Sequence, residues 1–508
     1  MGQVDRGTRA QRPVVAVVGG GIAGLAAAWE LVTGPGPTPT VHVIEAGNQV
    51  GGKLRSTEFA GRTVDLAADA FLARRPEATQ LSEELGLTPR LIPVGATGAT
   101  VWSRGKLRSM PQGLNLGIPT RWLPLARSGI LSASGSLRAG LDLLLPHANQ
   151  STQVDDRAVG QIVRRRLGDQ VAERLADPLI GGIHAGGVDH LSAAATFPLL
   201  VTADRQRGSL MRRLGRPPTP AQQLASPPPS APPSPLFWSL EGGTAALAEE
   251  LATALVERGV HIHTGVAVES ISRQGGDQER WVLALSGHLH VADVRTLPDG
   301  GSALPVDGAV LAVPGRQASG LLGPHSMRAS GLLGSLDYAS VTVLTLAFPA
   351  EAIRSNLTGT GFLVPRTSEI LGHRALITGC TYLSRKWPHL ARPGDELIRL
   401  SVGRYGDTRP DGMSDDELVA AATAELASVL SVTSQPTESR VTRWHSAFPQ
   451  YPVGHLTRVA QIHESISSLP GLAVAGAAYH GVGIPACIGS GRAAAHDVRR
   501  TMAATSSP

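Results

Sequence analysis

Apolar runs that end at glycines mark both ends of the chain. Residues 14–18, VVAVV, form an unbroken apolar and β-branched run typical of a buried parallel strand, and an alanine-rich helical stretch follows them. Residues 40–45, TVHVIE, predict a second strand. Near the other end, the strand predicted over 472–474 turns through glycines into a helix that begins near Ile484. This pattern predicts an α/β fold.

The first glycine turn has the spacing G-x-G-x-x-G, with Gly19, Gly21 and Gly24 between strand and helix. The first glycine makes a tight turn, the second lets the backbone approach a pyrophosphate, and the third lets the helix pack on the strand. The helix then points its unpaired N–H groups at the phosphates. Glu45 ends the second strand, where a dinucleotide fold places an acid for the adenosine ribose hydroxyls. These residues predict a dinucleotide site, with an ordinary strand–turn–helix unit as the alternative.

A second glycine pair, Gly51 and Gly52, follows that acid and is itself followed by Lys53 and Arg55. Close approach of the backbone together with a nearby cation suits a site where pyrophosphate charge must be neutralised. A surface turn with solvated charges is the alternative.

The composition narrows the class of protein. With 508 residues, 42% of them hydrophobic, the chain predicts two or three domains with buried cores. The net charge of +5 comes from arginines spread along the chain, and aromatic residues are scarce, so we expect no nucleic-acid partner. Two cysteines, Cys380 and Cys487, form neither a disulfide framework nor a metal-ligand set, which favours a reducing cytoplasm and no metal.

No stretch has the ~18 apolar residues of a membrane-spanning helix, and residues 1–13 lack the apolar core of a signal peptide. The most apolar segment, 123–146, is broken by Arg127 and Arg138. It predicts an amphipathic or buried helical region. We therefore expect a cytoplasmic protein, with peripheral membrane association left open.

Further sequence stretches follow these motifs in order along most of the chain. They are AFLARRPEA (70–78), RRLGDQVAERLADPLIGGIHAG (165–186), LSAAATFP (191–198), SLEGGTAALAEEL (239–251), GFLVP (361–365), SRKWPH (384–389), LSVGRYGD (400–407), RWHSAFPQY (443–451) and AGAAYHGVGIPACIGSGR (475–492). Together with the glycine motifs, they resemble the FAD-dependent amine-oxidoreductase superfamily and, within it, the flavin porphyrinogen oxidases of haem biosynthesis. NAD dehydrogenases share the first glycine motif but not the last stretch.

The resemblance implies that one FAD is held by both ends of the chain. A helix that begins near Ile484 would direct its positive end at the pyrimidine side of the flavin, and Pro485 suits the first turn of that helix. Beyond Gly19, Gly21, Gly24, Glu45, Gly51, Gly52, Lys53 and Arg55, the implied cofactor contacts are Val268 at the adenine, Ala312 near the ribityl chain, Trp444 near the flavin, and Gly476, Val482, Gly483, Ile484 and Pro485 in the C-terminal loop. An edge strand or a buried core tryptophan would explain Val268, Ala312 and Trp444 equally well.

The chain departs from the family pattern at two places. Asn48 and Gln49 stand where the family has an arginine before the second glycine pair, so neutralisation of the pyrophosphate would rest more on Arg55. Residues 67–69, Ala-Ala-Asp, replace the family's Gly-Pro-Asp. How closely that loop approaches the flavin is therefore open.

The resemblance also implies a tetrapyrrole pocket lined by Gly182, His184 and Gly186. His184 stands where the family often has tyrosine and is the one weak candidate for a catalytic base. Arg74 and Arg75 are candidates for binding propionates, because a guanidinium matches a carboxylate in bidentate geometry. A solvated surface pair is the alternative for these two arginines.

The implied architecture is an α/β fold with a discontinuous Rossmann-like FAD-binding domain, a mixed-sheet substrate domain and a helical domain. The expected boundaries are 10–75, 236–315 and 470–503 for the FAD-binding domain, 76–110 and 316–469 for the substrate domain, 111–205 for the helical domain, and 206–235 for a flexible Pro-rich loop without a chemical role.

The implied reaction is the oxidation of a porphyrinogen in three two-electron steps, each a hydride transfer to flavin N5, with molecular oxygen as acceptor and hydrogen peroxide as product. Coproporphyrinogen III, which has four propionates, is the expected substrate of an arginine-rich chain without a membrane helix. Protoporphyrinogen IX is the alternative. An amine oxidase and a non-catalytic porphyrin carrier are more distant alternatives, and a ferrochelatase is the expected transient partner.

Overall fold

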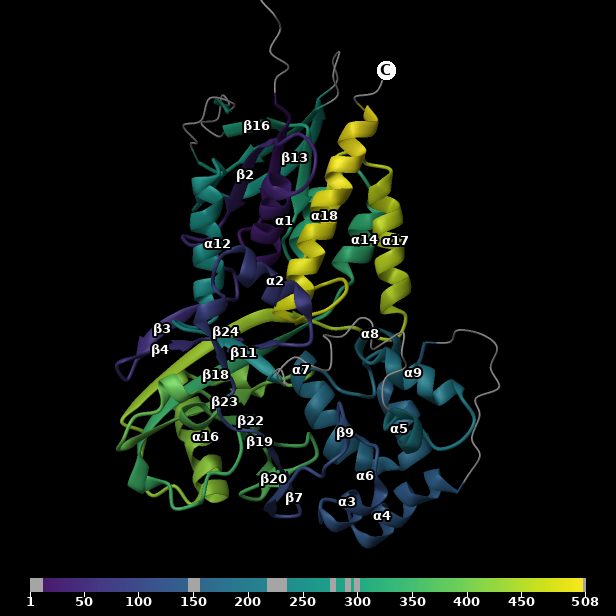
Figure 1. Cartoon of the computed structure of the whole chain (residues 1–508), viewed down its shortest axis with the longest axis vertical. Coiled ribbons are helices and arrows are strands. Elements are labelled where there is room, and N and C mark those ends of the chain that lie inside the picture. Colours follow the sequence, from purple (N-terminus) through teal and green to yellow (C-terminus); the bar gives the residue numbers. More distant parts are fainter. Residues whose placement is uncertain are drawn as a thin grey trace, which may run out of the picture.

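The computed structural model describes residues 12–144, 156–216, 235–274, 280–287, 294–296 and 302–505. In Figure 1, a five-stranded sheet and the long helix α18 form the upper half of the molecule. A seven-stranded sheet lies at the lower left, and a group of short helices lies at the lower right. The fold is therefore α/β, with three structural parts.

The five-stranded sheet is parallel and combines three distant stretches of the chain. Its order is β12 (His261–Thr264), β2 (Thr40–Glu45), β1 (Val14–Val18), β17 (Gly308–Leu311) and β25 (Leu472–Val474). All five residues of β1 are buried, as the apolar run predicts for a central parallel strand. The strands predicted over 14–18, 40–45 and 472–474 are confirmed.

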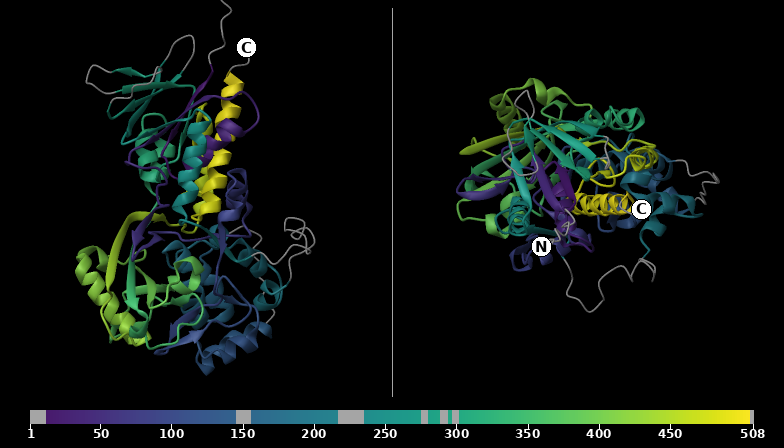
Figure 2. Two further views of the ribbon diagram at one scale, coloured as in Figure 1. Left: turned by 60° about the vertical axis from the view of Figure 1, so that its left-hand side comes forward. Right: turned by 90° about the horizontal axis from the view of Figure 1, so that it is seen from above.

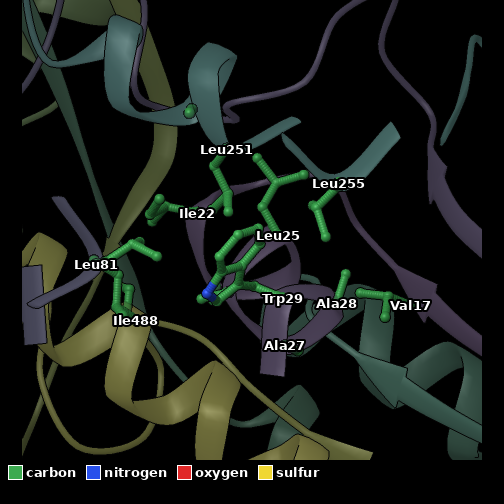
Figure 3. Packing of buried hydrophobic residues seen from close by; sticks show 14 of the residues in the cluster. Val17, Ile22, Leu25, Ala27, Ala28, Trp29, Leu81, Leu251, Leu255 and Ile488 are labelled. Atoms are coloured by element: carbon green, nitrogen blue, oxygen red, sulfur yellow. The ribbon is translucent and has the colours of Figure 1, made fainter. Parts of the chain in front are cut away.

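Helices cover one face of this sheet. They are α1 (Ile22–Thr33), α2 (Pro76–Glu84), α12 (Ala245–Glu257) and α18 (Ile484–Thr505). Figure 3 shows Leu25 and Trp29 of α1 packed among Leu81 of α2, Leu251 of α12 and Ile488 of α18. Figures 1 and 2 show the C-terminal helix (yellow) beside the N-terminal helix (purple). This shared core joins the two ends of the chain.

The other face of the sheet is covered by segments that were expected to lie elsewhere. The covering elements are α13 (Gly315–Leu322), α14 (Met327–Gly334), α17 (His455–Ser467) and a sheet of β13 (Val268–Gln274), β14 (Arg280–Leu285), β16 (Ser302–Val306) and β15 (Arg295–Thr296). Residues 316–334 and 455–467 were predicted in the substrate domain. They pack instead on the five-stranded parallel sheet, because Leu322, Leu333 and Ile462 share one apolar cluster with the strands of that sheet.

The second large sheet is mixed, as predicted. Its order is β24 (Glu438–Pro449), β18 (Tyr338–Pro349), β23 (Asp395–Val402), β22 (Ile377–Tyr382), β19 (Gly361–Leu363), β7 (Thr100–Ser103) and β8 (Lys106–Ser109). Only the β19–β7 pair is parallel among the pairs that the described residues form in this sheet. Helix α16 (Asp415–Leu430) packs on it and begins with a capping box of Ser414 and Glu417.

The third part consists of short helices around one apolar cluster. They are α3 (Trp122–Arg127), α4 (Ala133–Gly140), η2 (Leu141–Leu143), α5 (Val159–Leu167), α6 (Asp169–Val171), the π-helix η3 (Ala172–Gly181), α7 (Gly182–His184), α8 (Ala193–Thr196), α9 (Pro198–Arg205) and α10 (Leu210–Leu214). The apolar segment 123–146 forms α3, α4 and η2 up to residue 144 and lies outside the described residues beyond it. No helix in the described part of the chain is long and apolar enough to cross a membrane.

The predicted Pro-rich loop begins later than expected. Residues 206–216 include α10, whose Leu210 and Met211 are fully buried. Their backbone N–H groups donate to the Asp142 carboxylate, at 3.1 and 3.0 Å. These long-range hydrogen bonds order a stretch whose own sequence shows no periodicity. Residues 217–234, which hold the proline-rich run, lie outside the described residues.

Smaller elements connect these parts. They are β3 (Ser56–Phe59), β4 (Arg62–Asp65), β5 (Phe71–Leu72), η1 (Thr88–Arg90), β6 (Leu91–Pro93), β9 (Leu114–Asn115), β10 (Ile118–Pro119), β11 (Phe237–Leu240), η4 (Ala350–Ala352), β20 (Glu369–Ile370), β21 (His373–Arg374), α15 (Leu383–Lys386), η5 (Pro388–Leu390) and η6 (Arg409–Gly412). Strand β11 pairs with β5 and β6, so the chain that enters α12 is tied to the segment around α2.

Three histidines stack at the edge of the parallel sheet. The ring of His42, on β2, lies 4.8 Å from that of His261 and 5.4 Å from that of His263, both on β12. Nδ1 of His42 lies 3.1 Å from Nε2 of His263, within hydrogen-bond distance. His42 is fully buried. Burial, followed by the neighbouring His261 and His263, lowers the pKa of His42 to about 4.

We expect this histidine stack to make the protein less stable in acid. Between about pH 6.5 and 4, His42 binds a proton in the unfolded chain but not in the folded protein, so the free energy of unfolding falls as the pH falls. In a His42→Leu variant, the free energy of unfolding should fall by about 1 kcal/mol less for each pH unit of acidification than in wild type. Urea unfolding at pH 7, 6 and 5 measures it, with His190→Leu, at an exposed histidine, as control. Equal slopes for wild type and His42→Leu would contradict the expectation.

Candidate active site

A cavity of about 640 Å³ lies at the carboxyl ends of the parallel strands. Its wall includes Val18, Glu45, Ala312 and Ala475, which end or directly follow β1, β2, β17 and β25. Open α/β sheets bind ligands at this edge, and the volume falls within the range of about 300–1,000 Å³ for ligand sites. The first and last segments of the chain therefore meet around one cavity.

The three motif glycines differ in what surrounds them. Gly19 has a φ of +105°, and a Cβ there would lie 2.5 Å from the carbonyl oxygen of Ala312. A Cβ at Gly24 would lie 1.9 Å from the carbonyl oxygen of Gly19, so both positions exclude a side chain by close packing. At Gly21 the nearest atom would be 3.9 Å away, at Gly52 Cα. Gly21 and Gly19 line the cavity, whereas Gly24 does not.

The second glycine pair lies against the first. The backbone N–H of Gly51 donates to the carbonyl oxygen of Gly20 at 2.8 Å, and both Gly51 and Gly52 line the cavity. Glu45 also lines it and accepts hydrogen bonds of 2.7 Å from the backbone N–H groups of Gly20 and Gly47. Each carboxylate oxygen keeps a lone pair for a hydroxyl donor.

The two cations after the glycine pair have different positions. Lys53 lines the cavity and keeps accessible surface there; burial of its amino group lowers its pKa, and the neighbouring Cys487 opposes this. Arg55 does not line the cavity, and its Nε donates to the carbonyl oxygen of Gly52 at 2.9 Å. Arg55 therefore supports the glycine turn, and Lys53 is the cation of this pair that faces the cavity.

The C-terminal loop forms another part of the cavity wall. Gly476 has a φ of +126°, and a Cβ there would meet no atom within 4 Å. Val482, Gly483 and Ile484 line the cavity, while Pro485 lies in the first turn of α18 and does not line it. The N-terminus of α18 thus opens at the cavity wall, where its free N–H groups favour negative charge.

Val268, Ala312 and Trp444 complete the predicted cofactor contacts, and all three line the cavity. Nε1 of Trp444 donates to the carbonyl oxygen of Leu66 at 3.0 Å, which fixes the indole beside the neighbouring lining residues Ala67 and Ala68. The loop that departs from the family pattern therefore reaches the cavity.

Several lining residues were not found from the sequence. Tyr338 and Phe448 lie at the ends of β18 and β24, and Gln317 lies on α13. The hydroxyl of Tyr338 accepts the backbone N–H of Gly315 at 2.7 Å. Cys487 also lines the cavity, and burial raises its pKa to about 11 against the effect of Lys53, so it is a protonated thiol at neutral pH. The sequence stretches 443–451 and 475–492 contain Phe448 and Cys487, but they do not specify that these side chains line the cavity.

The residues predicted to bind the substrate do not line this cavity. Arg74 and Arg75 are exposed, and Arg75 pairs with Glu77 at 2.8 Å. Gly182 is exposed, whereas His184 and Gly186 are buried. Arg74 and Arg75 lie just beyond β5, and β5 directly follows the lining residue Ala70.

The loop that holds His184 nevertheless borders the cavity. Ala185, within that loop, packs in one apolar cluster with the lining residues Trp444 and Phe448. Burial, together with His455, lowers the pKa of His184 to about 4, so the imidazole is neutral at physiological pH. The backbone oxygen of His184 accepts a hydrogen bond of 2.9 Å from the Gln450 side chain.

Asp69 and Lys386 form a buried network near the cavity. The Asp69 carboxylate accepts hydrogen bonds from Nζ of Lys386 at 2.8 Å and from Nε1 of Trp387 at 3.0 Å, and Arg399 lies at 3.5 Å. Burial alone would favour the neutral acid, but Lys386 and Arg399 hold the pKa of Asp69 below its ordinary value. Among the described residues, no group of histidine, cysteine, aspartate and glutamate could hold a metal ion.

Comparisons with known proteins place the whole chain among flavoproteins. Residues 22–499 match the family described as flavin containing amine oxidoreductase. The chain is 33% identical to the coproporphyrinogen III oxidase of Bacillus subtilis, covering 95% of this chain and 97% of that protein. It is 34% identical to the coproporphyrinogen III oxidase of Propionibacterium freudenreichii, covering 95% and 90%. A solved structure from Exiguobacterium sp. 255-15 is similar with a TM-score of 0.80, 29% identity, and coverage of 96% of this chain and 99% of that one.

Proposed function

Because the chain belongs to the flavin-containing amine oxidoreductase family, we propose that it is an FAD-dependent oxidase that converts coproporphyrinogen III to coproporphyrin III in haem biosynthesis. The observation that carries the proposal is the similarity, along nearly the whole chain, to two proteins named coproporphyrinogen III oxidase. The oxidoreductase class and the FAD cofactor follow from the family itself.

The cavity residues fit FAD. Gly21 and Gly476 both line the cavity without a side chain; a Cβ at Gly21 would have Gly52 Cα at 3.9 Å, and a Cβ at Gly476 would meet no atom within 4 Å. The N-terminus of α1 follows Gly21, and that of α18 follows Gly483, so two helix N-termini with unpaired N–H groups begin at the cavity lining. We assign the α1 end, with Glu45 at the ribose, to the adenosine diphosphate half of FAD. We assign the α18 end and Trp444 to the flavin.

When bound, FAD would supply the two-electron acceptor for three hydrides, taken one after another from meso carbons of the porphyrinogen, with molecular oxygen as final acceptor and hydrogen peroxide as product. The chain's own part is to orient the substrate and exclude water. Trp444 and Phe448 supply apolar surface at the cavity, and the neighbouring loop of Ala185 covers them. His184 is buried, and no contact among the described residues places it as a base, so we assign no residue to proton loss from the pyrrole nitrogens.

Charge favours coproporphyrinogen III over protoporphyrinogen IX. The first substrate has four propionates, and Arg74 and Arg75 lie exposed close to the lining residue Ala70. Of these two arginines, Arg75 is paired with an acid, Glu77, and no ion pair of Arg74 is found among the described residues. An exposed guanidinium in this position is free to pair with a carboxylate of the substrate.

We expect an Arg74→Ala/Arg75→Ala variant to raise the KM for coproporphyrinogen III about fivefold and to leave kcat unchanged. An exposed charge pair contributes up to about 1 kcal/mol, which corresponds to that factor. Initial rates of porphyrin fluorescence measure the change, and Arg500→Ala, on the exposed surface of α18, is the matched control. An unchanged KM would remove these arginines from the substrate site.

The alternatives are weaker. An amine oxidase of this family commonly places a lysine at flavin N5, but Lys386 is bound to Asp69 and does not line the cavity. Lys53 does line it, but it follows the glycine pair that lies against the first glycine turn, at the end assigned to the adenosine diphosphate half. Protoporphyrinogen IX undergoes the same ring chemistry and remains the second candidate substrate. A carrier without activity would bind FAD or porphyrin but would not reduce the flavin.

The test uses the FAD-loaded protein. Initial aerobic rates of porphyrin fluorescence are compared for coproporphyrinogen III and protoporphyrinogen IX, together with hydrogen peroxide release. We expect a higher kcat/KM for coproporphyrinogen III and one peroxide for each two-electron step. A preference for protoporphyrinogen IX would replace the substrate assignment. Anaerobic addition of either porphyrinogen without loss of flavin absorbance would refute both porphyrinogen oxidase proposals.

We further propose that the enzyme acts in the cytoplasm and passes its product to a ferrochelatase. Leu137 of α4 and Leu144 after η2 are exposed, and they offer apolar surface for peripheral contact with a membrane. Sedimentation with anionic vesicles tests the membrane contact. Co-elution with a purified ferrochelatase tests the partner.

A further inference from the structure

The segment 450–455 joins β24 to α17 and lies beside the C-terminal loop 476–484. In Figure 1, the chain runs from β24 past the lower end of α18 to the lower end of α17. Tyr451, in the connection, is 1% exposed, and His455, the first residue of α17, is fully buried. Buried polar side chains in such a connection require hydrogen-bond partners.

Tyr451 makes its hydrogen bonds to the C-terminal loop. Its hydroxyl donates to the carbonyl oxygen of Ala477, a cavity-lining residue. Burial raises the pKa of Tyr451, and a backbone hydrogen bond from Gly481 opposes this effect. One phenol therefore contacts both arms of the turn between Ala477 and Gly481.

His455 makes the next contact along the same loop. Its Nε2 lies 3.0 Å from the carbonyl oxygen of Tyr479, so this nitrogen carries the proton and donates. The ring stacks on that of Tyr451, with centroids 4.1 Å apart and planes at 13°. Burial lowers the pKa of His455 to about 4, against the backbone hydrogen bond of Tyr479, so the ring stays neutral with a single N–H.

The same segment contacts the loop around His184. The Gln450 side chain donates to the backbone oxygen of His184 at 2.9 Å, and the His184 ring lies 5.4 Å from that of Tyr451. Residues 450–455 thus connect the wall of the cofactor cavity with the loop that borders Trp444 and Phe448.

We infer that Tyr451 and His455 are positioning residues that hold the C-terminal loop in the conformation that binds FAD. The hydrogen bonds to the carbonyls of Ala477 and Tyr479 fix the orientation of the 477–478 and 479–480 peptide groups, and Ala478, between them, lines the cavity. Without them, the loop between Gly476 and Gly483 would have to be ordered when FAD binds, which weakens binding. The inference rests on the FAD assignment and is independent of which porphyrinogen is oxidised.

The experiment compares Tyr451→Phe, His455→Gln and His455→Phe with wild type. Apo-protein is titrated with FAD, and the visible circular dichroism of the bound flavin is recorded. Tyr451→Phe and His455→Phe remove a donor, so we expect FAD to dissociate about five- to tenfold more readily and the flavin dichroism to change. His455→Gln keeps a donor near the Nε2 position and should restore both. Tyr382→Phe, at a buried tyrosine of the mixed sheet, is the matched control.

A purely structural role would lower the melting temperature and leave the dissociation constant and the flavin dichroism at wild-type values; that outcome would overturn the inference. Equal FAD affinities for His455→Gln and His455→Phe would also overturn the inference. This comparison tests the inference even if Tyr451→Phe does not fold. Because no porphyrinogen is added, a failure here is distinct from a failure of the proposed reaction.

Discussion

Replacing Gly21 by leucine is expected to weaken FAD binding about 100-fold while the protein still folds. A Cβ at Gly21 would have its nearest neighbour at 3.9 Å, so the fold itself has room for a side chain. Gly21 lines the cavity, however, and the leucine would occupy the space in which the backbone approaches the pyrophosphate. Such overpacking costs about 1–3 kcal/mol, and each 1.4 kcal/mol is tenfold in affinity.

Titration of the apo-protein with FAD, followed by flavin fluorescence, measures the change. The matched control is Gly331→Leu, because a Cβ there meets no atom within 4 Å and the position is exposed on α14 and does not line the cavity. Its affinity should equal that of wild type. An FAD affinity of Gly21→Leu within threefold of wild type would show that the pyrophosphate does not pass this turn.

Replacing Asp142 by alanine is expected to lower the free energy of unfolding by about 3–5 kcal/mol, the range for loss of one partner of a buried ion pair. The side chain of Asp142 is fully buried and that of Arg166, 2.9 Å away, is 1% exposed. Asp142 also accepts hydrogen bonds from the Ser209 hydroxyl and from two backbone N–H groups of α10. The alanine variant would remove the nearer of the two carboxylates beside this buried guanidinium, leaving Asp204 at 3.9 Å, and would leave α10 without its anchor.

Chemical denaturation followed by circular dichroism measures this loss, and limited proteolysis reports local opening near residues 206–216. The control is Asp169→Ala, which also removes an aspartate from an arginine, Arg164, but at a side chain that is 74% exposed. Exposed pairs contribute about 0–1 kcal/mol. If both variants lost the same free energy, the buried pair would not be the anchor of this region.

Local patterns of the sequence were sufficient to predict the strands and glycine turns that frame the cofactor cavity. The apolar run before Gly19, the spacing to Gly24 and the acid at Glu45 are short-range features, because strand periodicity and glycine turns depend on neighbouring residues. The structure brings these residues and the C-terminal loop together at the ends of the parallel strands. The order of matching stretches along the chain identified the fold class.

Other features depend on contacts between residues far apart in the chain. Lys386 and Asp69 are separated by 317 positions, so the sequence could not reveal that this lysine is already bound. Arg55 turns to a neighbouring carbonyl, and Lys53 faces the cavity, although both are cations in the same turn. Helix composition alone likewise could not assign α17 to the five-stranded parallel sheet.

By itself, the sequence determined the strands and glycine turns that form the cavity edge, since these depend on local backbone conformation and on the period of apolar residues. Only the tertiary structure decided which side chains face the cavity and which hold other parts of the chain. Tyr451 and His455 are the clearest case, because their partners, Ala477 and Tyr479, lie 26 and 24 positions away. The direction of a buried polar side chain is set by the hydrogen-bond partner that the fold brings to it.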